Sequence, residues 1–462
     1  MATRGLQRES VIIARMNNAG GTAQSEELLK AAAGQIEARD YARARQYCEE
    51  ALQAAPQDID ALAMLGRIAM LQYRWPEAVE LLDRVLRLRV DPWTLANLGN
   101  CHWKLGDLDR AEYCLRGAVE LLPDLIASRV SLATVLHARQ RFDEALQELE
   151  IAARSPLADH QIDARRGCTL ARLGQFDEAQ AAFERAARNA GKFTYSRLVA
   201  FDRRTWDAVS MAGVPPGPPM TAIAAPALSQ GHVTLISCNP PYVRKFGLPF
   251  LRSYAACAQR DGVLHLHVYD PDDGIIDEAR TVARACALTN LAVTTEHSPF
   301  PAARPQQRKA YYACGRLAHM EHWLTLYQRP VMSLDADFIV EGPLAGIVAA
   351  AHGVDLALNP REPIDSPWLD LIANIIVANP TPAARAYFSA VRSYAMAALA
   401  REPDSWLVDQ SAMYCVLEMA RRYATPPAIA WLPRDIESGR LWHIGHAYDH
   451  LLDDPRYQKY AS

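Results

Sequence analysis

The chain has 462 residues and a net charge of −4 at pH 7; 50% of its residues are hydrophobic and 22% are charged. This composition is typical of an ordinary globular protein, and the slightly acidic balance argues against nucleic acid as a partner. The sequence shows no apolar run long enough for a transmembrane segment, and Val11–Ile13 is too short for the core of a signal peptide. We therefore expect a cytoplasmic protein, and the length suggests about two to four domains.

The nine cysteines are scattered, and none belongs to a C-x-x-C pair. Their spacing indicates neither a zinc site nor a disulfide framework. We expect most of them to be small buried side chains in a reducing compartment.

After an N-terminal extension (residues 1–23), residues 24–192 contain an internal repeat. An alanine recurs every 33 or 34 positions, and a second small or apolar residue follows each alanine after seven positions. These ten positions are Ala44, Ala51, Ala78, Val85, Ala111, Ala118, Ala145, Ala152, Ala179 and Ala186. The pattern resembles the tetratricopeptide repeat, a helix–turn–helix unit of that period. It predicts an all-α solenoid of about five repeats, in which small residues let helices approach closely and stacking buries the apolar positions.

A solenoid of this kind presents a concave surface. We expect this surface to hold a protein or peptide, with homo-oligomer formation through the repeats as an additional role. The alternative is that the repeats serve only self-association or rigid spacing.

Residues 193–230 join the repeats to the rest of the chain. Lys192–Val209 is predicted to form one more amphipathic helix that caps the array. The stretch 212–230 contains Gly213–Met220, whose prolines interrupt regular structure and make a linker semi-rigid.

From residue 231 to residue 462, apolar strands alternate with helices. This alternation predicts an α/β domain with a mostly parallel sheet covered on both faces. Ligands in such sheets bind at the carboxyl ends of the strands. The expected strands are 233–237, 263–269 and 291–296, and the expected helices are 243–259, 276–287 and 307–327.

The stretch Pro330–Val340 is predicted to be a buried strand that carries two acids, Asp335 and Asp337. Side chains alternate along a strand, so both carboxylates should point the same way. Paired carboxylates suit a hard ion such as Mg²⁺ or Mn²⁺, which proteins usually bind together with substrate phosphates. A nucleotide-linked substrate is therefore expected. The alternative is a strand that simply ends in a polar turn.

Other polar residues are expected at the same edge of the sheet. Ser237, Asn239 and Asp270 end the first two strands, so they should converge on the same edge as the two acids. The helix before the acids carries Arg308, Tyr311, Tyr312 and Arg316 near one face. Arginines on this face would suit the charge of a diphosphate, although a solvated helix face with half-buried tyrosines is the alternative.

The segment Tyr311–Arg316, followed by Pro330–Asp337, resembles the nucleotide-diphospho-sugar transferases, the GT-A glycosyltransferases. Three later stretches fit this resemblance: a strand at 355–359, an asparagine-containing strand at 373–380, and an Asp-Gln pair within 406–410. The resemblance covers residues 231–450. It implies a Rossmann-like GT-A domain that transfers a sugar.

For the metal, the resemblance implies that Asp337 is a ligand and that Asp335 binds through water or contacts the donor ribose. It also implies a late histidine ligand, for which His443 is the first choice and His446 the second. A structural role for either histidine is the alternative.

For the reaction, the resemblance places Asp409 nearest the anomeric carbon, as a base or an electrostatic stabiliser. The alternative is an acid that caps or opens a helix. The expected donor-binding set is Ser237, Asn239, Asp270, Arg308, Tyr312, Arg316, Asp335, Asn374 and Gln410.

These observations predict a Mn²⁺- or Mg²⁺-dependent glycosyltransferase with a nucleotide-sugar donor, UDP-sugar favoured, acting on a protein or peptide held by the repeats. The alternatives are a glycan- or lipid-linked acceptor, a non-catalytic adaptor with a degenerate transferase domain, and a nucleotidyltransferase. The sugar, the base and the stereochemical outcome stay open.

Overall fold

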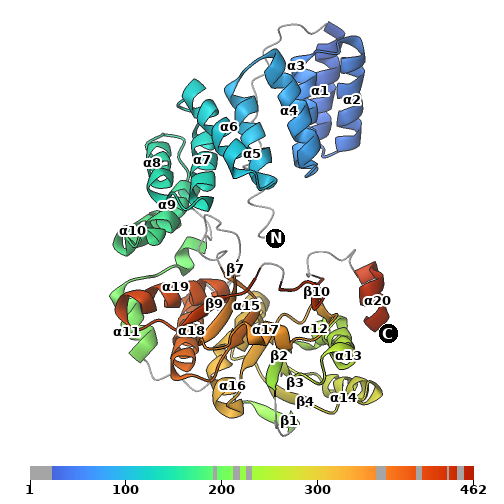
Figure 1. Cartoon of the computed structure of the whole chain (residues 1–462), viewed down its shortest axis with the longest axis vertical. Coiled ribbons are helices and arrows are strands. Elements are labelled where there is room, and N and C mark those ends of the chain that lie inside the picture. The colour runs from blue at the N-terminus through green and yellow to red at the C-terminus, as the bar shows by residue number, and fades with distance from the viewer. Residues whose placement is uncertain are drawn as a thin grey trace. The chain divides into compact units, whose positions relative to one another are not determined.

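The computed structural model consists of two compact units, Met1–Gln175 and Phe176–Ser462 (Figure 1). It describes residues 23–190, 195–211, 219–224, 231–360, 371–401, 408–433, 436–444 and 452–461. Among the described helices, none combines the length and the apolar character needed to cross a lipid bilayer.

The first unit consists of helices packed in consecutive pairs, α1 on α2, α3 on α4, α5 on α6 and α7 on α8. Several helices begin at an aspartate; Asp58, for example, accepts hydrogen bonds from the N–H groups of Asp60 (3.0 Å) and Ala61 (3.1 Å). The helices are α1 (Ala23–Glu37), α2 (Tyr41–Ala54), α3 (Ile59–Leu71), α4 (Trp75–Leu88), α5 (Pro92–Lys104), α6 (Leu108–Leu121), α7 (Ile126–Ala138), α8 (Phe142–Ala153) and α9 (His160–Arg172).

The repeated small residues lie where the sequence predicted them. Ala44, Ala78, Ala111 and Ala145, on the second helix of each pair, have no exposed surface. Their partners seven positions later are equally buried. Gly99 shows why small residues are needed, because an added Cβ would lie 2.7 Å from Leu115 Cγ. The predicted helical solenoid is therefore confirmed.

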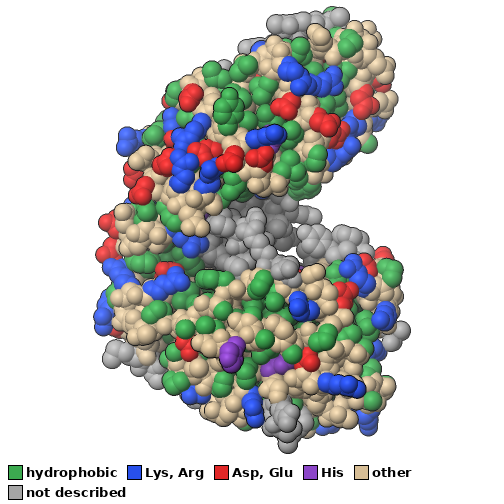
Figure 2. Space-filling model, viewed as in Figure 1, with side chains coloured by type: hydrophobic (Ala, Val, Ile, Leu, Met, Phe, Trp, Pro, Cys, Tyr) green, Lys and Arg blue, Asp and Glu red, His purple; other side chains and the backbone are tan. Residues whose placement is uncertain are grey.

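On the face drawn in Figure 2, acidic and basic side chains are intermixed over the helical unit. An ion-pair network joins α6 to the start of α8. Glu112 accepts from Arg116 (2.9 Å) and Arg141 (2.6 Å), and Arg141 also pairs with Glu144 (2.6 Å). Networks of this kind add modest stability.

The second unit starts with α10 (Phe176–Asn189), followed by a short 3₁₀ helix, η3 (Tyr195–Leu198), and α11 (Arg203–Met211). The single helix expected over Lys192–Val209 is therefore wrong. The hydroxyl and N–H groups of Thr205 bond to Asp202 (2.7 and 2.9 Å), which starts a new helix after the break. Much of the expected linker, residues 212–218 and 225–230, lies outside the described residues.

An eight-stranded sheet forms the centre of this unit, in the order β1-β4-β3-β2-β5-β8-β7-β9. β2 is parallel to β3 and β5, whereas β8 is antiparallel to β5 and β7. The sheet is therefore mixed rather than mostly parallel. The strands are β1 (Thr221–Ala224), β2 (His232–Cys238), β3 (Gly262–Tyr269), β4 (Leu291–Glu296), β5 (Val331–Leu334), β6 (Phe338–Val340), β7 (Leu356–Pro360), β8 (Leu371–Ala378), β9 (Ile429–Trp431) and β10 (Leu441–His443).

Helices cover both faces of the sheet (Figure 1). Leu264, Leu266 and Val268 of β3 join an apolar core with α13 and α14, while His265 and His267 contact the ring of Trp323 on the other face. The helices are α12 (Pro240–Tyr242), a π-helix η4 (Val243–Gly247), α13 (Leu248–Cys257), α14 (Ile275–Ala285), α15 (Pro305–Ala318), α16 (Met320–Tyr327), α17 (Ala345–Ala349), α18 (Pro382–Arg401), α19 (Val408–Tyr423) and α20 (Pro455–Ala461).

The acid-bearing stretch is not one strand. β5 ends at Leu334, residues 335–337 form a turn, and β6 begins at Phe338. β6 leaves the main sheet and pairs with β10 instead. The alternation of strand side chains therefore does not explain how the two acids point. The expected helix over 307–327 is likewise divided, with a break at His319.

Candidate functional site

Asp335, Asp337 and His443 lie together at the turn after β5. Their ligand atoms all lie within 4.8 Å of one another. The pairing of β10 with β6 sets His443 opposite Phe338, and the N–H of Ile444 donates to the carbonyl of Asp337 at 2.9 Å. As a result, His443 Nε2 lies 3.4 Å from Asp337 Oδ1. The structure thus brings together the three residues expected to hold the metal; that they do so stays a prediction.

The position of this group in the sheet is informative. After β2 the chain builds β3 and β4 on one side, and then returns to place β5 on the other side of β2. Parallel strands whose connections diverge in this way leave a crevice at their carboxyl ends, which is where such sheets bind ligands. The acid turn follows the carboxyl end of β5 directly.

The three side chains differ in burial. Asp337 is 4% exposed, whereas Asp335 is 30% and His443 is 38% exposed. The group is thus anchored on one side and open on the other, so that a bound ion would keep positions for a second ligand. His446 lies outside the described residues.

The electrostatic field at this group attracts positive charge. Burial acts to lower the pKa of His443, but the hydrogen bond and negative charge of Asp337 outweigh burial and raise the pKa above its ordinary value. Two carboxylates and an imidazole offer the oxygen and nitrogen donors that Mn²⁺ and Mg²⁺ accept. The residues present therefore fit a divalent ion.

Tyr242 is a member of the site that sequence reasoning missed. Its hydroxyl donates to Asp337 Oδ2 at 3.0 Å. Tyr242 lies on α12. At the start of this helix, the carbonyl of Asn239 accepts hydrogen bonds from the N–H groups of Tyr242 (3.0 Å) and Val243 (2.9 Å). Ser237 and Asn239 were predicted because they lie at the carboxyl end of a strand. The same reasoning could have included Tyr242, which lies three positions after Asn239.

Arg316 is buried and forms an ion pair with Asp335. Its other terminal nitrogen donates to the carbonyl of Ala373 at 2.8 Å, and the N–H of Asp335 donates to the carbonyl of Asn374 at 3.0 Å. Asp335 is thus fixed against β8 and partly neutralised. The arginine predicted to meet a diphosphate is already paired with one of the acids.

Asn374 uses its side chain inside the protein. Its oxygen accepts from Asn359 at 3.0 Å, and its nitrogen donates to Glu437 at 3.1 Å. It therefore braces the loop before β10, which carries His443. Nothing in the sequence singled out Glu437.

Asp409 lies in the first turn of α19 and is buried. Burial raises its pKa to about 6, although the nearby positive charge of Arg316 acts in the opposite direction. Among the described residues, the side-chain oxygen of the neighbouring Gln410 has no hydrogen-bond partner. A carboxyl group with this pKa can exchange a proton near neutral pH.

Asp270, Arg308 and Tyr312 form a second group at the end of β3. Arg308 makes an ion pair with Asp270, the Tyr312 hydroxyl donates to Asp270 at 2.6 Å, and the N–H of Ser298 donates at 3.0 Å. Burial would raise the pKa of Asp270, but these donors lower it. Arg308 and Tyr312 are thus held to Asp270 and do not form one cationic face with Arg316. Tyr311, in contrast, is buried and donates to Glu296 at 2.7 Å.

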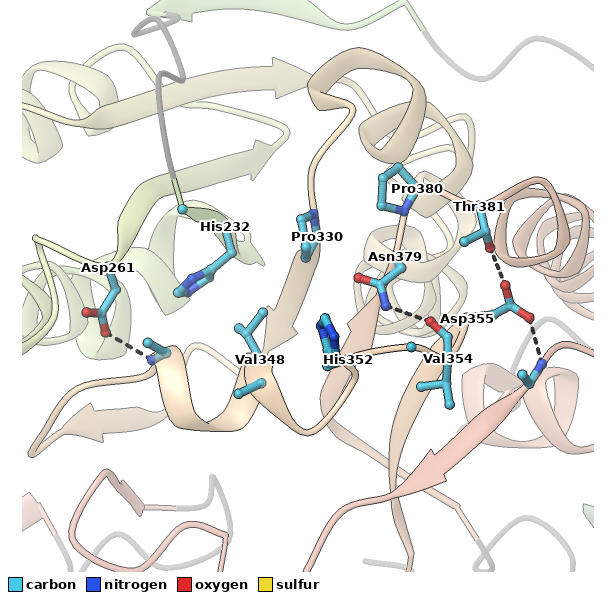
Figure 3. A pocket seen from close by; sticks show the side chains of 15 residues that line it. His232, Asp261, Pro330, Val348, His352, Val354, Asp355, Asn379, Pro380 and Thr381 are labelled. Atoms are coloured by element: carbon cyan, nitrogen blue, oxygen red, sulfur yellow. Dashed lines mark hydrogen bonds between the residues drawn. The ribbon is translucent and has the colours of Figure 1, made fainter.

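A hollow of about 850 Å³ lies at the opposite ends of the strands (Figure 3). It is lined by residues such as His232, Asp261, His352 and Asp355. Its two carboxylates close loops: Asp261 accepts from the N–H of Leu344 at 2.6 Å, and Asp355 accepts from the N–H of Ala428 at 2.7 Å. This hollow is separate from the acid turn, and its two carboxylates serve the fold.

Comparison with known proteins concerns the helical repeats. A tetratricopeptide repeat model matches residues 35–95, and a tetratricopeptide repeat-like domain model matches residues 97–203. The N-terminal helices are tetratricopeptide repeats. This domain is therefore of the protein-interaction type, as the sequence predicted. No curated protein matches the chain.

Several solved structures resemble part of the chain. YrrB, described as a protein with an unusual peptide-binding site, is 19% identical over 37% of this chain and 88% of its own, with a TM-score of 0.33. TTC0263, from Thermus thermophilus, is 22% identical over 38% and 95%, with a TM-score of 0.32. MamA from Desulfovibrio magneticus RS-1 is 15% identical over 37% and 97%, with a TM-score of 0.35.

Proposed function

We propose that residues 231–462 form a metal-dependent glycosyltransferase of the GT-A type, and that the tetratricopeptide repeats hold its protein or peptide acceptor. The observation that carries the proposal is the grouping of Asp335, Asp337 and His443 within 4.8 Å at the carboxyl end of β5. A half-open group of this composition is suited to a cation that also binds the diphosphate of a nucleotide sugar.

The bound divalent ion would neutralise the charge on the leaving diphosphate as its bond to the sugar breaks. Asp337 and His443 would hold the ion, and Tyr242 would fix the orientation of the Asp337 carboxylate. Asp335, restrained by Arg316, would meet the ion through water or contact the donor ribose.

Asp409 is the candidate to act near the anomeric carbon. In transfer, the bond between that carbon and the diphosphate oxygen breaks, a bond to the acceptor oxygen forms, and the acceptor loses a proton. The raised pKa of Asp409 would let its carboxylate accept this proton near neutral pH, or its charge would stabilise a cationic transition state.

The acceptor-binding role of the repeats is supported by polar residues on the first helix of each pair. First helices of neighbouring pairs contact each other, α1 with α3 and α5 with α7, which is the arrangement of the inner layer of a solenoid. Arg165 donates to the Thr134 hydroxyl at 3.0 Å across two of these helices. The polar residues on these first helices recur at spacings of 33 or 34 positions. They are Arg67, Asn97, Asn100, Ser131, Thr134 and Arg165.

Donor hydrolysis tests the enzymatic part. The purified chain is incubated with Mn²⁺ and a panel of nucleotide sugars, beginning with UDP-sugars, and nucleoside diphosphate release is measured. We expect slow release that falls to background in Asp337→Asn. The matched control is Asp277→Asn, whose carboxylate is 84% exposed on α14, and this variant should behave as wild type.

The other outcomes separate the alternatives. If the wild-type chain neither binds nor hydrolyses any nucleotide sugar, the adaptor hypothesis replaces the proposal. Release of pyrophosphate from nucleoside triphosphates would indicate a nucleotidyltransferase.

A further inference from the structure

A second group of metal-type ligands lies inside the α/β unit, on the face of the sheet that packs against α15 and α16. It consists of His267 on β3, Glu296 at the end of β4, and His319 at the break between α15 and α16. Their side chains are 1%, 0% and 2% exposed. The group shares no residue with the acid turn.

Both histidines have a ring nitrogen close to the same carboxylate oxygen. His319 Nε2 lies 2.9 Å and His267 Nε2 lies 3.6 Å from the same oxygen, Glu296 Oε2. The three residues offer ligand atoms that all lie within 4.8 Å of one another. The 3.6 Å separation is too long for a hydrogen bond. Among the described residues, His267 Nε2 has no hydrogen-bond partner although it is buried.

Neighbouring residues occupy the second polar atom of two of these side chains. The Thr294 hydroxyl lies 2.7 Å from His267 Nδ1, and the Tyr311 hydroxyl donates to Glu296 Oε1 at 2.7 Å. Contacts of this kind fix the tautomer and orientation of metal-ligating histidines and carboxylates. The Nε2 atoms of His267 and His319 both lie near the remaining carboxylate oxygen, Glu296 Oε2.

We propose that His267, Glu296 and His319 bind a zinc ion. Two imidazoles and one carboxylate form a ligand set that zinc accepts. Because the three side chains are enclosed, the ion would be taken up as the chain folds and would not exchange with solvent. Its role would be to join β3, β4 and the α15–α16 break, with a water molecule as the fourth ligand of the tetrahedral ion. The proposal does not depend on the transferase activity.

The alternative is a site without an ion, in which His319 alone pairs with the Glu296 carboxylate, at 2.9 Å. Metal analysis separates these arrangements. The double variant Asp337→Asn/His443→Gln, which lacks the exposed site, is expressed in zinc-supplemented medium and dialysed against EDTA. We expect about one zinc per chain. A zinc content near zero in this folded protein would overturn the proposal.

The ion is assigned to the cluster by variants and spectroscopy. His319→Gln should lose the zinc, whereas His322→Gln, at an exposed position of α16, should keep it. If His319→Gln fails to fold, X-ray absorption of the double variant gives the ligands directly. We expect nitrogen and oxygen at about 2.0–2.1 Å, and a sulfur ligand at about 2.3 Å would contradict the assignment.

Discussion

The hydroxyl of Tyr242 donates a hydrogen bond of 3.0 Å to Asp337 Oδ2, although the two residues are 95 positions apart. His443 approaches the other oxygen of the same carboxylate, at 3.4 Å. Asp337 is therefore held from two sides, by a residue that follows β2 and by a residue of β10. This arrangement fixes the carboxylate before any ion binds.

Replacing Tyr242 with phenylalanine should weaken metal binding without unfolding the protein. The change removes one hydrogen bond that orients a ligand, and such losses reduce metal affinity or activity by about tenfold or more. Mn²⁺ affinity is measured by calorimetry. Tyr113→Phe, at a residue that is 79% exposed on α6, is the control. Equal affinities for the two variants would show that Tyr242 does not support the site.

Asp409→Asn should change how stability depends on pH. Burial raises the pKa of Asp409 to about 6 in the folded chain, from an ordinary value of 3.8. The folded state therefore binds this proton more tightly than the unfolded state does, and the wild-type chain loses stability as pH rises from about 4 to about 6.

The size of this effect is up to about 3 kcal/mol, from a pKa difference of about two. Urea unfolding of wild type and Asp409→Asn is compared at pH 4.5 and pH 7 in EDTA. The wild-type chain should lose more stability than the variant over this interval. A parallel change in the two proteins would mean that Asp409 is not titrating abnormally.

Gly99→Ala should destabilise the helical repeats. The added methyl group would lie 2.7 Å from Leu115 Cγ and 3.1 Å from the carbonyl oxygen of Ala111, and overpacking of this kind costs about 1–3 kcal/mol. Gly34→Ala is the matched control, because an added Cβ there meets nothing within 4 Å. The control should gain stability, by about 0.5–1 kcal/mol. Thermal melts followed by circular dichroism would reveal opposite shifts in Tm; shifts of the same sign would count against tight packing at Gly99.

Phe201→Ala should loosen the start of the second unit. The ring of Phe201 lies 5.7 Å from Phe176, 5.9 Å from Phe183 and 6.0 Å from Tyr414, between centroids. It joins α10 to α19, and truncating a buried aromatic residue costs about 3–5 kcal/mol. Trp431→Ala, at a half-exposed position, is the comparison. Similar amide exchange in α10 for both variants would show that Phe201 does not hold these helices together.

The repeats were readable from the sequence because their packing demands the same small residue at the same place in every unit. Ala44, Ala78 and Ala111 are all buried. The repeat period in the sequence therefore reflects the close packing of helices in each unit. The direction of β8 was not readable. An apolar run such as Leu371–Ala378 records burial on both faces but not whether the strand runs with or against its neighbours.

Part of the candidate site could also be predicted from the sequence, and part could not. Asp335 and Asp337 were found because only one residue separates them in the chain, although a turn, not strand alternation, directs them. Tyr242 was missed because its contact depends on how α12 leaves the sheet. The pairing of β10 with β6 involves three residues on each strand, which is too short a pattern to recognise.

We propose that Asp337 and His443 hold a divalent ion beside a nucleotide. Anomalous diffraction from crystals of the chain grown with Mn²⁺ and UDP would locate this ion. We predict a manganese peak in contact with Asp337 and His443 and with the diphosphate oxygens. Bound UDP with no manganese at these two side chains, or no binding of either ligand to the folded protein, would contradict the account.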